Sequence, residues 1–103
     1  MSKKTDTRAL SALRSVGPAA LEDLRLLGVA DVSDLAGRDP QALYDALCRI
    51  KGQEIDICCL DVFNCAVAQA KNPELPEDQR NWFWWSRQRK AATSPRIADK
   101  ASA

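Results

Sequence analysis

Residues 10–29 have the sequence LSALRSVGPAALEDLRLLGV, which predicts two helices joined by a tight turn. The leucines before the turn recur at helical spacing, so we expect a first helix over residues 6–14. The second helix should begin at Pro18, because the first position of a helix suits a residue without an N–H group. It should end at Leu27, since Gly28 suits the left-handed position just beyond a helix.

The turn between these helices resembles the helix-hairpin-helix motif, with Ser15 at the place of the motif's first glycine. A helix that begins after Gly17 leaves its first N–H groups without intrahelical partners, and the helix dipole adds partial positive charge there. Such an end can hold a phosphate, which glycine allows to approach closely. Val16 should anchor the turn in the core. The candidate phosphate-binding residues are Ser15, Val16, Gly17, Ala19 and Ala20 by their backbone, and Arg14 and Arg25 by charge.

The rest of the chain also has helical spacing, and no segment alternates in the two-residue pattern of a strand. Further helices are expected at about residues 31–36, over residues 40–51 behind an Asp39 N-cap, over about residues 55–71, and as a short turn after Pro76. The sequence therefore predicts an all-α domain.

The net charge of +1 hides a strong segregation. Residues 1–14 carry a net charge of +3, residues 15–79 carry −7, and residues 80–103 carry +5. Basic ends can hold phosphates by releasing their counterions. They can equally be solvated tails that keep the chain in solution, and the sequence leaves both interpretations open.

Three parts of the chain follow from these patterns. We expect residues 1–5 to be disordered, residues 6–85 to form the helical domain, and residues 86–103 to form a flexible basic tail. Three basic residues of that tail, Arg87, Arg89 and Lys90, are candidates for additional phosphate contacts.

The chain of 103 residues has four cysteines and no histidine, so catalytic triads and histidine-containing zinc sites are absent. The cysteines form no C-x-x-C pair, and we expect them to pack in the core as reduced thiols, with no metal, no cofactor and no enzymatic activity. The sequence has no membrane-spanning run and no secretory signal, so we expect a cytoplasmic protein. The cysteines are Cys48, Cys58, Cys59 and Cys65.

All three tryptophans lie within residues 82–85, which have the sequence WFWW and are flanked by basic residues. Aromatic side chains in such a context can stack on unpaired bases. They can also cap a helical core that has few other aromatic residues, which is the interpretation we favour. A third alternative is an exposed patch that docks another protein.

Beyond the turn, the chain resembles the small bacterial pathogenicity locus family, some of whose members carry the name mitomycin resistance protein. The resemblance covers about Leu10 to Trp85 and includes EDLRLLGV (residues 22–29), DLAGRDP (residues 34–40) and DICCLDVF (residues 56–63). It implies a five-helix, SAM-domain-like fold and a role in DNA binding.

The expected function is therefore a non-enzymatic DNA-binding module that uses the helix-hairpin-helix turn as its phosphate site. Contacts to phosphates carry no sequence information, so we expect no sequence specificity. The alternative is a protein-interaction module of the same fold without direct contact to DNA.

Overall fold

A computed structural model describes residues 9–102, with side chains for residues 9–92. Within that part the chain forms five α-helices and two short 3₁₀ helices and has no strand, which confirms the all-α class. In chain order the elements are η1 (Leu10–Ala12), α1 (Pro18–Leu26), α2 (Val32–Ala36), α3 (Pro40–Lys51), α4 (Cys58–Lys71), η2 (Glu77–Arg80) and α5 (Trp82–Ser102).

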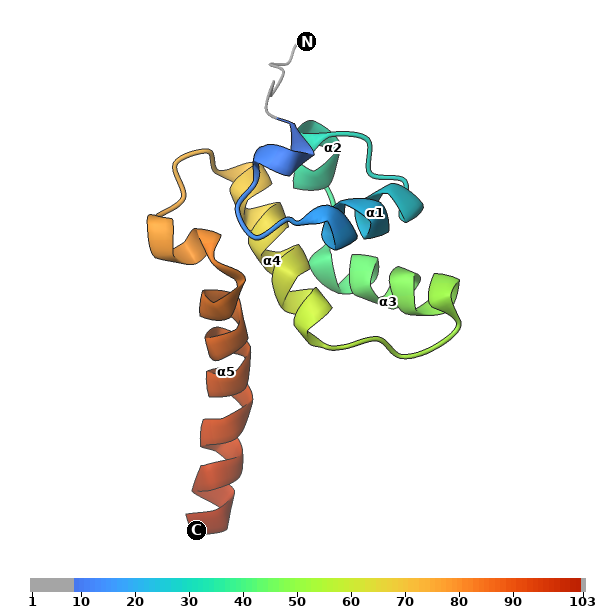
Figure 1. Cartoon of the computed structure of the whole chain (residues 1–103). Helices are drawn as coiled ribbons and strands as arrows, with labels where there is room; N and C mark the ends of the chain where they lie inside the picture. Colours follow the sequence, from blue (N-terminus) through green and yellow to red (C-terminus); the bar gives the residue numbers. More distant parts are fainter. Residues whose placement is uncertain (1–8, 103) are drawn as a thin grey trace.

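Helix α4 is the centre of the fold, and it packs against α2, α3 and α5 (Figure 1). Its sequence is rich in small and apolar residues, which lets neighbouring helices approach it from several sides. No helix in the described part is long and apolar enough to cross a membrane. The buried core consists of Leu13, Val16, Leu24, Val29, Val32, Leu35, Leu43, Tyr44, Leu47, Phe63, Ala66, Val67 and Ala70.

The starts and ends of α1 and α3 confirm the predictions from proline and glycine. Helix α1 begins at Pro18 and α3 begins at Pro40. Gly28 and Gly52 follow the two helices with positive φ angles of 80° and 70°, a conformation that glycine adopts without a steric penalty.

Helix α4 begins three residues later than residue 55, where the sequence predicts its start. The carboxylate of Asp56 accepts the N–H of Cys58 at 2.9 Å and so caps the helix from outside. The carbonyl of Ile55 accepts the hydroxyl of Tyr44 at 2.5 Å, which holds this residue against α3 instead.

The predicted first helix over residues 6–14 is wrong for its described part, which has only the single turn η1. Residues 1–8, and with them the predicted disorder of residues 1–5, lie outside the described residues. The backbone of Arg14 turns to the side chain of Gln69 in α4 instead of continuing a helix. Its N–H donates to Gln69 Oε1 and its carbonyl accepts from Gln69 Nε2, both at 2.8 Å.

The predicted start of a flexible tail at residue 86 is also wrong. Helix α5 runs through this position and projects beyond the body of the molecule (Figure 1). Ser86 is buried, and the guanidinium of Arg89 binds the carboxylate of Asp61 in α4 through two hydrogen bonds of 2.9 Å. The packed domain therefore extends at least to Arg89.

Candidate nucleic-acid interface

Ser15 adopts a left-handed conformation with a φ angle of 69°, which the first glycine of the motif would adopt more easily. Its hydroxyl supplies contacts that glycine lacks. Ser15 Oγ donates to the carbonyl of Arg80 and accepts the N–H of Trp82, both at 3.1 Å. The turn is thereby joined to the segment that leads into α5.

Helix α1 has an open N-terminal end. Gly17 occupies the N-cap without a side-chain hydrogen bond, and Pro18 has no N–H group. Among the described residues, the N–H groups of Gly17, Ala19 and Ala20 have no acceptor. The structure thus brings together, at one exposed end, three of the five backbone groups that the sequence predicts.

The start of α3 provides a direct contrast. It has the same order of N-cap and proline, but its N-cap is Asp39, whose carboxylate accepts the N–H of Ala42 at 3.3 Å. The carboxylate also offsets the positive end of the helix dipole. The N-terminal N–H groups of α3 are therefore capped by the Asp39 side chain. Those of α1 have no side-chain cap and can bind an external acceptor.

Val16 has a structural role, as predicted for its side chain. The side chain is buried in the core, and its N–H points back to the carbonyl of Leu13 at 3.4 Å. Its backbone N–H is therefore engaged within the turn and does not join those of Gly17, Ala19 and Ala20.

The two arginines predicted to attract phosphate both have carboxylate partners. Arg14 forms an ion pair with Glu77 at the surface, and Arg25 lies 3.8 Å from Glu22 on its own helix. Exposed pairs of this kind are weak and screened by salt, so the guanidinium groups can exchange partners. Their charge is nevertheless partly offset in the free protein.

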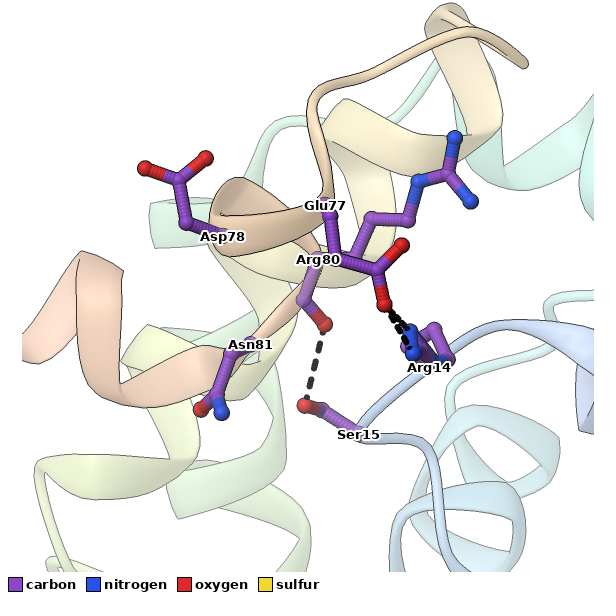
Figure 2. A pocket seen from close by; sticks show the side chains of 6 residues that line it. All are labelled: Arg14, Ser15, Glu77, Asp78, Arg80 and Asn81. Carbon is purple, nitrogen blue, oxygen red and sulfur yellow. Dashed lines mark hydrogen bonds and ion pairs between the residues drawn. The ribbon is translucent and has the colours of Figure 1, made fainter.

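On one side of Ser15 lies a hollow of about 380 Å³ with mixed charge (Figure 2). Two guanidinium and two carboxylate side chains line it, so it has no excess positive charge for an anion. The lining residues are Arg14, Ser15, Glu77, Asp78, Arg80 and Asn81.

On another side of the turn lies a hollow of about 470 Å³ that no carboxylate lines. It joins Ser15, Val16 and Gly17 to the start of α5, where Asn81, Trp82 and Phe83 lie. A third hollow of about 300 Å³, between the start of α1 and α4, is mostly apolar. The turn is accessible from both of these sides.

The three basic residues of the predicted tail divide between two environments. Arg89 is held by the fully buried Asp61, so its guanidinium has a structural role. Arg87 and Lys90 are exposed, and neither has an acidic partner among the described side chains.

The tryptophan cluster combines packing and exposure. Trp82, Trp84 and Trp85 are half-buried, and the indole N–H of Trp85 donates to the carbonyl of Gln79 at 2.8 Å. None of the three tryptophans is among the partly buried residues that pack against the main core cluster, so the core cap stays a prediction. Phe83 differs, because 54% of it is exposed to solvent.

The prediction that the cysteines pack in the core holds in part: Cys65 is fully buried, and the half-buried Cys48 and Cys59 pack against the main core cluster, whereas Cys58 is half-buried outside that cluster. Burial raises the pKa of the Cys65 thiol to about 11, which keeps it protonated at neutral pH. In the described part of the chain, no three cysteine, aspartate or glutamate side chains are grouped so that they could hold a metal ion.

Two buried polar residues of α4 were not singled out from the sequence. Asp61 and Gln69 both lie on the buried face of α4, where they hold α5 and the turn before α1. An acidic residue that falls on the apolar face of a predicted helix, as Asp61 does, indicates that a cationic partner lies nearby, because the burial of an unpaired carboxylate is costly. The partners, however, are distant in sequence.

Comparison with known proteins agrees with the resemblance found in the sequence. A model of the pathogenicity locus family matches residues 3–91. The chain is also similar to the mitomycin resistance protein McrB of Streptomyces lavendulae, with 31% identity over 97 residues that cover 94% of this chain and 89% of that protein. No solved structure gives a significant match. Because both matches span most of its length, the chain belongs to the pathogenicity locus family.

Proposed function

We propose that the protein is a non-enzymatic DNA-binding module of SAM-domain-like fold, in which the turn at residues 13–17 and helix α1 serve as a helix-hairpin-helix-like phosphate site, although only the single 3₁₀ turn η1 stands in place of the motif's first helix. The observation that supports this most directly is the open end of α1, where Gly17, Ala19 and Ala20 present unpaired N–H groups to solvent. A backbone phosphate satisfies such donors and the positive end of the helix dipole together.

The groups available at this site determine whether the protein reads the base sequence of DNA. Contacts through backbone N–H groups and through Arg14 and Arg25 reach phosphates and not base edges, so binding is independent of sequence. The exposed cations Arg87 and Lys90 add a salt-dependent contribution.

A salt titration tests the proposal. Fluorescence anisotropy with a labelled 20-base-pair duplex should give an affinity that falls about 40-fold between 50 and 200 mM salt, if about three phosphates are neutralised. The variant Gly17→Glu should lower the affinity at least tenfold, because it places a negative charge beside the phosphate. It should keep the fold, since Gly17 has an ordinary φ angle of −91° and no atom within 4 Å of an added Cβ.

Gln53→Glu is the matched control, because it adds the same charge in the exposed connection between α3 and α4. Circular dichroism should show equal helix content in both variants and in the wild type. If Gly17→Glu and Gln53→Glu lower the affinity equally, the end of α1 is not the phosphate site.

A protein-interaction module is the second candidate, favoured by exposed apolar side chains near the C-terminal ends of α1 and α3. Leu26 and Ile50 are about half exposed, on the two helices that the Lys51–Asp23 ion pair joins at 3.5 Å. This candidate predicts no measurable duplex binding at 50 mM salt, and that outcome would replace the DNA-binding proposal.

A further inference from the structure

Helix α5 has two faces of opposite character in its described part. Ser86 is buried and Arg89 binds Asp61, so the face that includes them packs on α4. Phe83, Arg87 and Lys90 follow one another at i, i+4 and i+7, and all three are exposed. Residues with this spacing share one side of a helix, so an aromatic ring and two cations form a single row toward solvent.

The aromatic end of this row is a stacked pair. The rings of Trp82 and Phe83 have centroids 4.1 Å apart and an angle of 24° between their planes. Trp82 is half-buried and supports the pair from the side of the body, whereas 54% of Phe83 is exposed. The pair therefore continues into solvent as a ring on which a further flat group can stack.

The backbone that holds the pair is fixed by two side chains before any ligand arrives. Ser15 Oγ accepts the N–H of Trp82 at 3.1 Å, and Asn81 Oδ1 accepts the N–H of Phe83 at 2.9 Å. Because these contacts already order the segment, a ligand meets a largely preformed surface, which lowers the entropic cost of binding.

The row also borders the turn before α1. Trp82 and Phe83 line the hollow of about 470 Å³ together with Ser15, Val16 and Gly17, and no carboxylate lies among its lining residues. A ligand seated on the ring therefore has the open end of α1 on one side. On the other side, about one and two helical turns from Phe83, it has Arg87 and Lys90.

We propose that Phe83, backed by Trp82, is a stacking platform for an unpaired base, so that the protein prefers single-stranded DNA or exposed ends to intact duplex. This rests on the proposed DNA binding and specifies its substrate class. A flat, uncharged base flanked by phosphates matches an exposed ring next to two cations that have no acidic partner within the described part of the chain. In a duplex the faces of the bases are covered by their neighbours, so the ring has nothing to stack on.

The test measures the affinities of the full chain for three labelled 12-mers, namely oligo(dT), a strand of the same length that is abasic at every position, and a duplex. Wild type should bind oligo(dT) about 5- to 160-fold more tightly than the abasic strand, the range that one stacked base contributes. Phe83→Ala should remove that difference and leave duplex affinity within about twofold. Phe83→Trp should retain the difference, because it keeps an aromatic face.

Leu26→Ala is the matched control, since it removes an apolar side chain of comparable exposure from α1 and should leave all three affinities unchanged. If Phe83→Ala lowers all three affinities equally, or none, Phe83 is not a base platform, although the proposed DNA binding stands. Equal wild-type affinity for oligo(dT) and the abasic strand also overturns the inference. Absence of all binding at 50 mM salt overturns both proposals, and Phe83 would then belong to a protein-docking surface.

Discussion

Arg89 and Arg87 are two residues apart on the same helix, yet they belong to different regions of the molecule. Arg89 lies on the inner face of α5 and is bonded twice to Asp61, whose side chain is inaccessible to water. Arg87 lies on the outer face with Lys90 and has no acidic partner among the described residues.

The difference between the two faces shows that the position of a cation around a helix, and not its residue type, decides its role. Arg89 compensates a buried charge and so holds α5 to α4. Arg87 and Lys90 are exposed and have no acidic partner among the described residues, so an anionic ligand can reach them. Both roles can be separated by substitutions that act on one face at a time.

Arg89→Ala should have the largest effect on stability. It leaves the carboxylate of Asp61 buried without its cation, and we expect the free energy of unfolding to fall by about 2–3 kcal/mol. This is less than the roughly 3–5 kcal/mol that the loss of one partner costs in a fully buried pair, because the side chain of Arg89 is itself 28% exposed. Urea denaturation followed by circular dichroism measures the loss.

The double variant Asp61→Ala with Arg89→Ala provides the control for this prediction. It removes both charges, so no unpaired carboxylate remains, and most of the lost stability should return. A double variant as unstable as Arg89→Ala alone would mean that the packing of the arginine, and not its charge, holds the inner face.

Substitutions of Ser15 should have the next largest effect, because its hydroxyl ties the turn to the start of the inner face. Ser15→Ala loses two hydrogen bonds and keeps a Cβ at a positive φ angle, so we expect a loss of about 2 kcal/mol. Ser15→Gly loses the same bonds but removes the steric penalty of a Cβ at positive φ, so the free energy of unfolding should fall by only about 1 kcal/mol. Thermal unfolding of both variants checks this order, which reverses if the left-handed conformation is not strained.

Arg38→Ala should have a smaller effect than Arg89→Ala, although both remove an arginine paired with aspartate. The Arg38–Asp34 pair, at 3.1 Å, is about one-third exposed on each side. The hydrogen bond from Arg38 lowers the pKa of the Asp34 carboxyl below its usual value. Its contribution is therefore present at pH 7 and is lost as the pH falls through that lowered pKa.

Urea denaturation at pH 7 and at a series of lower pH values checks this surface pair. Wild type and Arg38→Ala should differ most at pH 7, and the difference should shrink as the pH falls through the lowered pKa of the Asp34 carboxyl. A difference that is independent of pH would show that Arg38 acts through its hydrogen bond to the carbonyl of Gly28 instead.

Arg87→Gln and Lys90→Gln should have the smallest effect on stability, with no measurable change in the urea midpoint. Each should lower the slope of log affinity against log salt by about one, because each removes one phosphate contact. Anisotropy titrations of oligo(dT) at several salt concentrations measure this slope. An unchanged slope would remove the outer face of α5 from the proposed interface.

The sequence predicts local features of the fold well, because their causes are local. Pro18 and Pro40 start helices, and Gly28 and Gly52 end them, through backbone preferences that depend on a few neighbouring residues. The burial of Val16 follows from the same kind of short-range pattern.

The wrong predictions concern segments whose structure depends on distant partners. The helix predicted to end at Arg14 gives way to hydrogen bonds with Gln69, 55 residues further along the chain. The boundary predicted at residue 86 fails because Asp61 binds Arg89, 28 residues away. Periodicity contains no information on such pairs, so the open end of α1 could be predicted, whereas its position beside Phe83 could not.

The turn before α1 can reach its final structure only after residues much later in the chain have been synthesised. Its two anchoring residues, Arg14 and Ser15, bond to Gln69, Arg80 and Trp82, which lie 55 to 67 residues later. A chain synthesised from its N-terminus therefore exposes the turn long before these partners emerge. A fragment that stops before Arg80 lacks both bonds to Ser15, so the surface formed by the turn and the start of α1 depends on the segment that leads into α5.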